Sequence, residues 1–73
     1  MHTDFFVANL RQHKDQLEEL ISRLKEKDAL DQDDLQMYDE ATKQVEKRLR
    51  TLRNHIVEEV SKTVATNQIR KGL

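Results

Sequence analysis

The sequence predicts an all-α fold, an antiparallel two-helix hairpin in which the second helix is the longer. The prediction rests on the composition, the spacing of apolar residues and a single break between two periodic stretches. The 73 residues include one Gly and no Pro, whereas the turns of β-proteins need such residues at regular intervals. Charged residues make up 37% of the chain, and many charges with helical periodicity are typical of bundles and coiled coils.

The first periodic stretch predicts a helix over about residues 4–27. Thr3 or Asp4 is suited to be its N-cap, and Asp4 would also complement the positive end of the helix dipole. His13 occupies one position of the apolar stripe. The other positions recur at spacings that place them on one helical face, and they are Phe6, Leu10, Leu17, Leu20, Ile21 and Leu24.

The break lies at residues 28–31. Asp31 is a favourable N-cap, and Asp34 stands three residues later at the acidic position of a capping box. Leu30 and Leu35 have the spacing of a hydrophobic staple. These signals predict a loop over about residues 28–31 and a second helix over about residues 32–67. Because no Gly ends the first helix, a nearly continuous helix with a kink is the alternative.

The second stretch has a heptad pattern, with apolar spacings of three and four held over three repeats. Beyond this pattern the stripe drifts around the helix, because a step of four replaces a step of three. The heptad positions are Leu35, Tyr38, Thr42, Val45, Leu49, Leu52 and Ile56, and the later positions are Val57, Val60 and Val64.

A short connection makes the two helices antiparallel neighbours. If Leu24 pairs with Leu35, the numbers of facing residues sum to about 59, and Leu10 lies near Leu49. The second helix then extends past the first by roughly ten residues. Three valines on this overhang have nothing to pack against within one hairpin.

The width of the apolar stripes predicts a partner, because adjacent apolar pairs spread each stripe beyond a single seam. A homodimer that forms a four-helix bundle would cover these faces, and a larger protein partner is the alternative. The residues expected at such an interface are Phe5, Phe6, Leu10, Leu17, Leu20, Ile21, Leu24, Leu35, Tyr38, Val45, Leu49, Leu52, Ile56, Val57, Val60 and Val64.

The chain offers little for catalysis, so we expect a non-enzymatic interaction module, such as an adaptor, inhibitor or assembly factor. It has no Cys, no Gly-rich phosphate loop and no Ser–His pairing at motif spacing. His55 and Glu59 supply at most two ligands at i,i+4 spacing. No metal and no cofactor is therefore expected.

The whole chain is expected to form one domain, located in the cytoplasm. The longest apolar run, at residues 5–8, is far shorter than the roughly 20 residues of a membrane span. The first residues also lack the basic region that begins a secretory signal. No membrane contact is therefore expected.

Charge is segregated along the hairpin. Residues 28–40 hold six acidic residues and no basic one, whereas basic residues dominate from 43 to 53. The basic residues could contact the phosphates of a nucleic acid. They could equally form a solvated face with intrahelical pairs, and no interleaved aromatic is present to stack on bases. The possible nucleic-acid contacts are Lys43, Lys47, Arg50 and Arg53.

Part of the chain, from Leu17 to Leu49, resembles the helical hairpin of exonuclease VII small subunits. Residues 17–24 read LEELISRL, and Asp28 and the Leu35-x-x-Tyr38 pair follow at similar distances. Lys27 stands where that family prefers Gly, and Asp31 replaces an apolar loop residue. The resemblance implies a non-catalytic subunit that docks on a large nuclease subunit through its apolar face.

Overall fold

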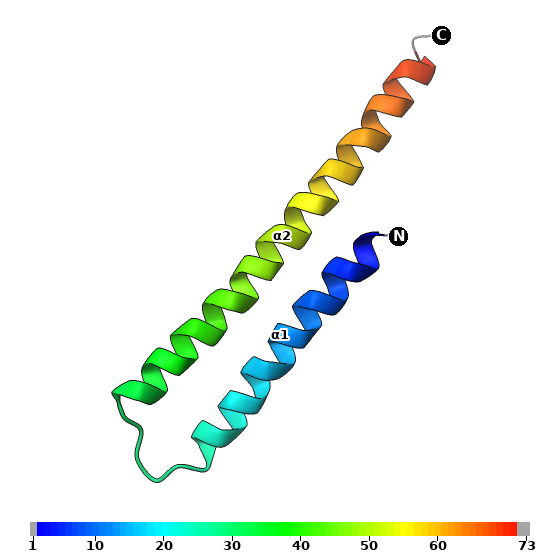
Figure 1. The fold of residues 1–73 in the computed structure, drawn as a ribbon. Helices are drawn as coiled ribbons and strands as arrows, with labels where there is room; N and C mark the ends of the chain where they lie inside the picture. Colours follow the sequence, from blue (N-terminus) through cyan, green and yellow to red (C-terminus); the bar gives the residue numbers. More distant parts are fainter. Residues whose placement is uncertain (1, 72–73) are drawn as a thin grey trace.

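The computed structural model describes the backbone of residues 2–71 and the side chains of residues 3–64. It consists of two α-helices, α1 (His2–Lys25) and α2 (Gln32–Lys71). They lie side by side and antiparallel, and α2 runs on past the start of α1 (Figure 1). The described residues contain no strand, which confirms the all-α fold and the helical hairpin.

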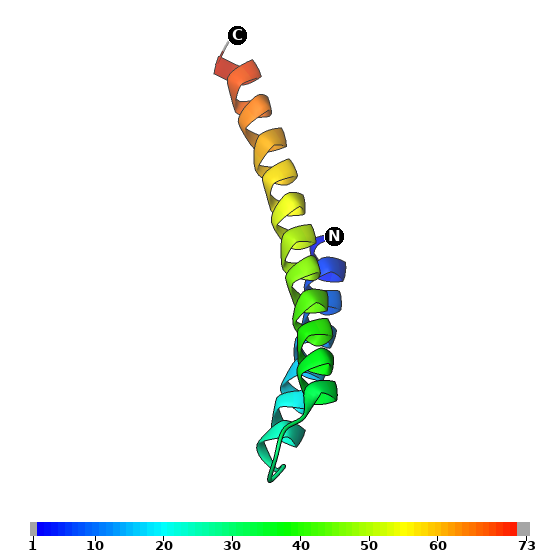
Figure 2. The same ribbon diagram turned by 90° about the vertical axis from the view of Figure 1, so that its left-hand side faces the viewer.

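The hairpin is a single layer of two helices, 68 × 19 × 13 Å along its principal axes. Figure 2 shows this layer edge-on, with no further element of the described chain on either broad face. No apolar side chain among the described residues is fully buried. The hairpin therefore has a seam between its helices but no enclosed core.

Both the beginning and the end of α1 differ by a few residues from the expectation. The helix begins at His2, so Thr3 and Asp4 lie in its first turn and neither is the N-cap. It ends at Lys25, where the amides of the next two residues turn back to carbonyls three positions earlier, each at 3.2 Å. Such bonds tighten a last helical turn and satisfy carbonyls left free at the helix end.

The loop reverses the chain without a left-handed residue. No residue in the described part has a positive φ angle, so the turn does not need the Gly that the sequence lacks. The chain nevertheless leaves the helix over residues 26–31 and comes back antiparallel. The alternative of a continuous, kinked helix is therefore wrong.

A reciprocal capping box begins α2, as the sequence predicts. The Asp34 amide donates to Asp31 Oδ1 at 2.9 Å, and the Asp31 amide donates to Asp34 Oδ2 at 3.0 Å. Lys27 Nζ reaches the other oxygen of the same carboxylate, Asp34 Oδ1, at 2.6 Å. Asp34 is 6% exposed and is the only buried residue among the described side chains. One carboxylate thus ties the loop to the start of α2.

These bonds favour the charged forms of both partners. The hydrogen bond from Lys27 and that from the Asp31 amide lower the pKa of Asp34 below its ordinary 3.8. In turn, the hydrogen bond to Asp34 raises the pKa of Lys27 above 10.5. The ion pair therefore contributes stability between these limits. That contribution declines as the pH falls through the Asp34 pKa or rises through the Lys27 pKa.

Polar contacts fix the register of the two helices. Thr3 Oγ1 lies 2.8 Å from His55 Nε2, and Arg48 Nε donates to Asn9 Oδ1 at 2.9 Å. Together with the contact at the turn, these pairs lie within two residues of the register expected from the sequence. The predicted register of the two helices along their axes is thus confirmed.

The rotation of α2 about its own axis differs from the expectation. Several heptad residues expected in the seam, among them Leu35, Leu49 and Ile56, are about half exposed. Most of the residues that form the seam stand one position before the expected heptad residues in the sequence. Arg48 and His55 occupy two of these positions, and their polar groups have partners on α1. The half-buried residues of α2 are Ala41, Thr42, Val45, Arg48, Leu52 and His55.

Replacing Asp34 with Asn should lower the thermal midpoint at pH 7, because Lys27 and the Asp31 amide donate to different oxygens of Asp34 and an amide offers only one oxygen. The natural protein should lose stability as the pH falls from 7 towards 3, and Asp34→Asn should lose less over that range. Removing the other half of the capping box by Asp31→Ala should cost about 1 kcal/mol. Circular dichroism melts at each pH measure these changes.

The matched control is Asp33→Asn, which changes a neighbouring exposed aspartate that is outside the capping box. It should melt close to the natural protein at pH 7. If Asp34→Asn kept the same acid sensitivity as the natural protein, the proposed role of this carboxylate would be refuted.

Candidate interaction surface

Most of the exposed apolar residues of α2 form one stripe along the helix, and Met37 lies outside it. Seven of them are between 40% and 55% exposed, and Thr42 lies among them. At 100° per residue they fall within an arc about 100° wide. We call this set the apolar stripe, and it consists of Leu35, Tyr38, Leu49, Ile56, Val57, Val60 and Val64.

The apolar stripe continues onto one broad face of the hairpin. At the loop end, Leu35 and Tyr38 line a hollow together with Leu24 and Leu30. This places the expected staple residues Leu30 and Leu35 beside each other. Ile21 is 43% exposed. Ile21 lies 100° further around α1 than Leu20. Because Leu20 lines a groove on the opposite broad face of the hairpin, Ile21 is turned away from that face.

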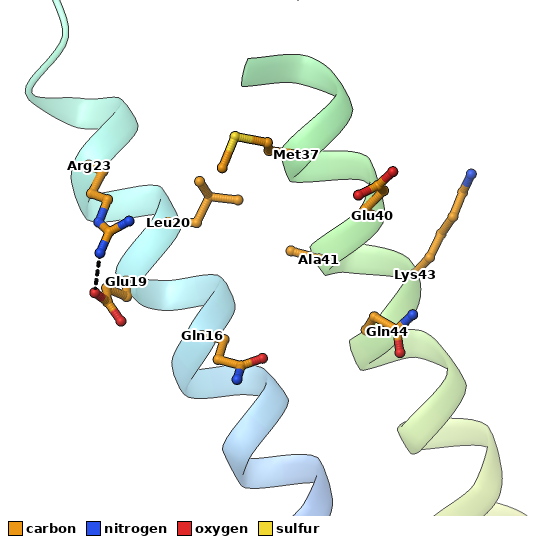
Figure 3. A pocket seen from close by; sticks show the side chains of 9 residues that line it. All are labelled: Gln16, Glu19, Leu20, Arg23, Met37, Glu40, Ala41, Lys43 and Gln44. Carbon is orange, nitrogen blue, oxygen red and sulfur yellow. Dashed lines mark hydrogen bonds and ion pairs between the residues drawn. The ribbon is translucent and has the colours of Figure 1, made fainter. Parts of the chain in front are cut away.

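The opposite broad face is mainly polar. Figure 3 shows an open groove there, in which Gln16, Glu19 and Arg23 of α1 lie across from Glu40, Lys43 and Gln44 of α2. Arg23 is held by Glu19 at 2.7 Å. Among the side chains that line the groove, the apolar ones are Leu20, Met37 and Ala41, and they approach one another between the helices. The hairpin is therefore amphipathic as a whole.

The stripe extends beyond the hairpin onto the overhang of α2. The first turn of α1 lies beside His55, because Thr3 bonds to its ring. The helix continues from there to Lys71, with α1 absent alongside it (Figure 1). The last three residues of the stripe have no neighbouring helix in the hairpin, as the sequence predicts, and they are Val57, Val60 and Val64.

The two adjacent aromatics at the open end have different surroundings. The Phe6 ring packs on the His55 ring with centroids 4.7 Å apart and is half-buried. Phe5 is 68% exposed and touches the edge of Phe6, with centroids 5.8 Å apart. Phe6 therefore closes the seam, while Phe5 lies at the surface.

The basic residues considered for nucleic-acid contact are all exposed on α2. Asp39 with Lys43 and Glu46 with Arg50 have the i,i+4 spacing of intrahelical pairs, but neither is among the ion pairs of the described residues. Arg48 instead belongs to the seam, where it bonds to Asn9 and to Gln44. The candidate contacts on the outside of α2 are Lys43, Lys47, Arg50 and Arg53.

Arg48 and His55 are seam residues that the sequence reasoning missed. The signal was present, because Ala41, Val45, Arg48, Leu52 and His55 also follow alternating spacings of four and three. This second pattern shares Val45 and Leu52 with the apolar heptad. Choosing the more apolar pattern as the seam was therefore the source of the error.

The described side chains include no group of three His, Asp or Glu residues that could hold a metal ion. His55, which has the spacing to share a metal with Glu59, is in contact with Thr3 and Phe6. His13, on the α1 stripe, donates from Nδ1 to the carbonyl of Asn9 at 2.9 Å. Neither described helix has an apolar stretch long enough to cross a membrane.

Comparison with known proteins adds no relative. No family model, curated protein or solved structure matches the chain. The resemblance to exonuclease VII small subunits therefore stays a prediction from residues 17–49.

Truncating the two phenylalanines should separate their roles. Phe6→Ala should destabilise the hairpin by about 1–2 kcal/mol, because roughly half of a large apolar side chain loses its contacts. Phe5→Ala, at the more exposed ring, should cost less than about 0.5 kcal/mol. Thermal and urea unfolding followed by circular dichroism give both values, and equal losses would contradict the assignment of Phe6 to the seam.

Proposed function

We propose that this protein is a non-enzymatic protein–protein interaction module that acts as a helical homo-oligomer, in the manner of an adaptor, inhibitor or assembly factor. The observation that carries the proposal is the apolar stripe. It is exposed along α2 from the loop to the overhang, on one face of an amphipathic hairpin. Continuous exposed apolar surface of this kind is typical of interaction sites.

The energetics support association. Small domains bury a low fraction of their chain surface and are marginally stable without disulfides, metals or oligomerisation. This chain has no Cys and its described part has no buried apolar side chain. Burial between copies would supply the apolar contacts that a lone hairpin cannot make, at about 25 cal/mol per Å² of apolar surface.

The polar face would remain free in such an oligomer. Its charged side chains, including the Glu19–Arg23 pair, stay in water, so the assembly would stay soluble while its apolar faces are covered. Phe5, exposed near Lys47 and Thr51 at the open end, is an anchor available for a further protein, because aromatic residues dominate interface hot spots.

Two other functions make distinguishable predictions. A small non-catalytic subunit of a nuclease complex would use the same apolar face to dock on a larger chain. A nucleic-acid-binding dimer would use the four exposed basic residues of α2, and its affinity would fall steeply with salt. The homo-oligomer instead predicts self-association that salt changes little, since apolar burial drives it.

The test compares two substitutions at equally exposed apolar residues on opposite faces. Leu49 is 51% exposed within the apolar stripe, and Met37 is 50% exposed beside the polar groove. Leu49→Lys should shift the protein to monomer and lower its thermal midpoint, because an ammonium would have to be buried between copies. Met37→Lys should leave the oligomer intact.

Multi-angle light scattering from about 1 to 200 µM measures the mass, and melts over the same range test for a concentration-dependent midpoint. A fully helical monomer at every concentration would reject the proposal. Equal responses of the two variants would show that the apolar stripe is not the contact surface.

A further inference from the structure

We propose that two copies pair antiparallel, α2 against α2, about a two-fold axis that passes near Leu49. This arrangement rests on the proposed self-association and specifies its partner surface. In this arrangement a second copy of the chain covers the apolar stripe. Three features favour it: the symmetry of the stripe, the positions of the uncovered surfaces and the charges beside them.

The apolar stripe has nearly the same spacing in both directions from its centre. Thr42 and Ile56 lie seven residues before and after Leu49, and Tyr38 and Val60 lie eleven residues before and after it. An antiparallel copy centred on Leu49 therefore places Tyr38 against Val60 of the second copy, and the reverse. Leu49 would meet its own equivalent. These central positions then face an apolar or small neighbour, as an isologous interface requires, whereas Val64 at the end of the stripe falls opposite position 34.

The two uncovered surfaces of one hairpin lie at opposite ends. The hollow at the loop end is lined by residues of α1, the loop and α2. The valines of the overhang lie beyond the start of α1. In an antiparallel pair, the overhang of each copy lies along the loop end of the other and covers its hollow. A parallel pair would instead leave each hollow facing only another loop end.

Charge also favours antiparallel over parallel pairing of the two α2 helices. Glu46 and Arg53 lie within the arc of the stripe, three residues before and four residues after Leu49, and both are exposed. Antiparallel pairing brings Glu46 of each copy opposite Arg53 of the other, whereas parallel pairing sets like charges together. It also keeps the two loop ends apart, each with six acidic residues and no basic one between 28 and 40.

The other acidic residues near the overhang do not oppose this arrangement. Glu58 and Glu59 fall outside the arc of the stripe, by their place on the helix. Glu59 also pairs with Lys62 at 3.6 Å. The carboxylate that the stripe brings near the centre of the interface is Glu46, which lies opposite Arg53 of the second copy.

Single cysteines test the direction directly, since the chain contains none. In the full-length protein, with oxidised glutathione as oxidant, Leu49→Cys should form a disulfide-linked dimer. Tyr38→Cys and Val60→Cys should each fail alone, because their sulfurs would lie about 33 Å from their own copies at 1.5 Å per residue. Mixed together, Tyr38→Cys and Val60→Cys should form a mixed dimer, which mass spectrometry identifies.

Efficient self-linking of Tyr38→Cys or Val60→Cys would overturn the antiparallel arrangement in favour of a parallel one. A dimeric mass without linking at Leu49 would overturn the register and leave the proposed self-association standing. A monomeric mass at 200 µM would overturn both proposals and assign the stripe to a different protein.

Charge exchange tests the pairing of Glu46 with Arg53 of the second copy. Glu46→Arg and Arg53→Glu should each raise the dimer dissociation constant about 2- to 10-fold, because two surface pairs are lost and like charges take their place. The double variant should return close to the natural value, and dilution calorimetry measures all four proteins. Additive weakening in the double variant would contradict the pairing of Glu46 with Arg53. The effect should shrink in high salt.

Discussion

Two packed helices touch along one line, and this geometric limit governs the whole molecule. A seam of that kind covers a narrow strip of each helix, while the apolar arcs of this chain are wider. No apolar side chain in the described part becomes fully buried. Only one edge of the apolar arc of α2 can therefore pack against α1, and the other edge stays exposed to water. The hairpin is amphipathic as a direct result.

Polar side chains decide which edge is covered. Arg48 and His55 lie on one edge of α2 and reach Asn9 and Thr3 across the seam. Both side chains are half-buried there, and these bonds spare them the cost of buried polar groups without partners. The more apolar edge, which includes Leu49, is consequently the exposed one. The rotation of α2 about its own axis thus determines both which residues stabilise the hairpin and which residues stay exposed for a partner.

Much of this fold could be predicted from local signals. The capping box of Asp31 and Asp34 marked the start of α2, and the short loop set the axial register. The rotation could not be predicted, because two heptad patterns overlap on α2 and share Val45 and Leu52. Choosing between them depends on contacts with α1, which no local pattern encodes. The interface residues and the function remain predictions, because their partners lie outside the chain.

The turn also governs a second way of joining chains. Every described residue has a negative φ angle, so nothing in the loop backbone itself forbids a helical conformation. The reversal is held by the capping box and by the contact of Lys27 with Asp34. If the turn straightened, α1 would separate from its own α2 and could make the same side-chain contacts on another chain. Such an exchange is the geometry of domain swapping. Acid, which neutralises Asp34, would weaken the contacts that hold the reversal.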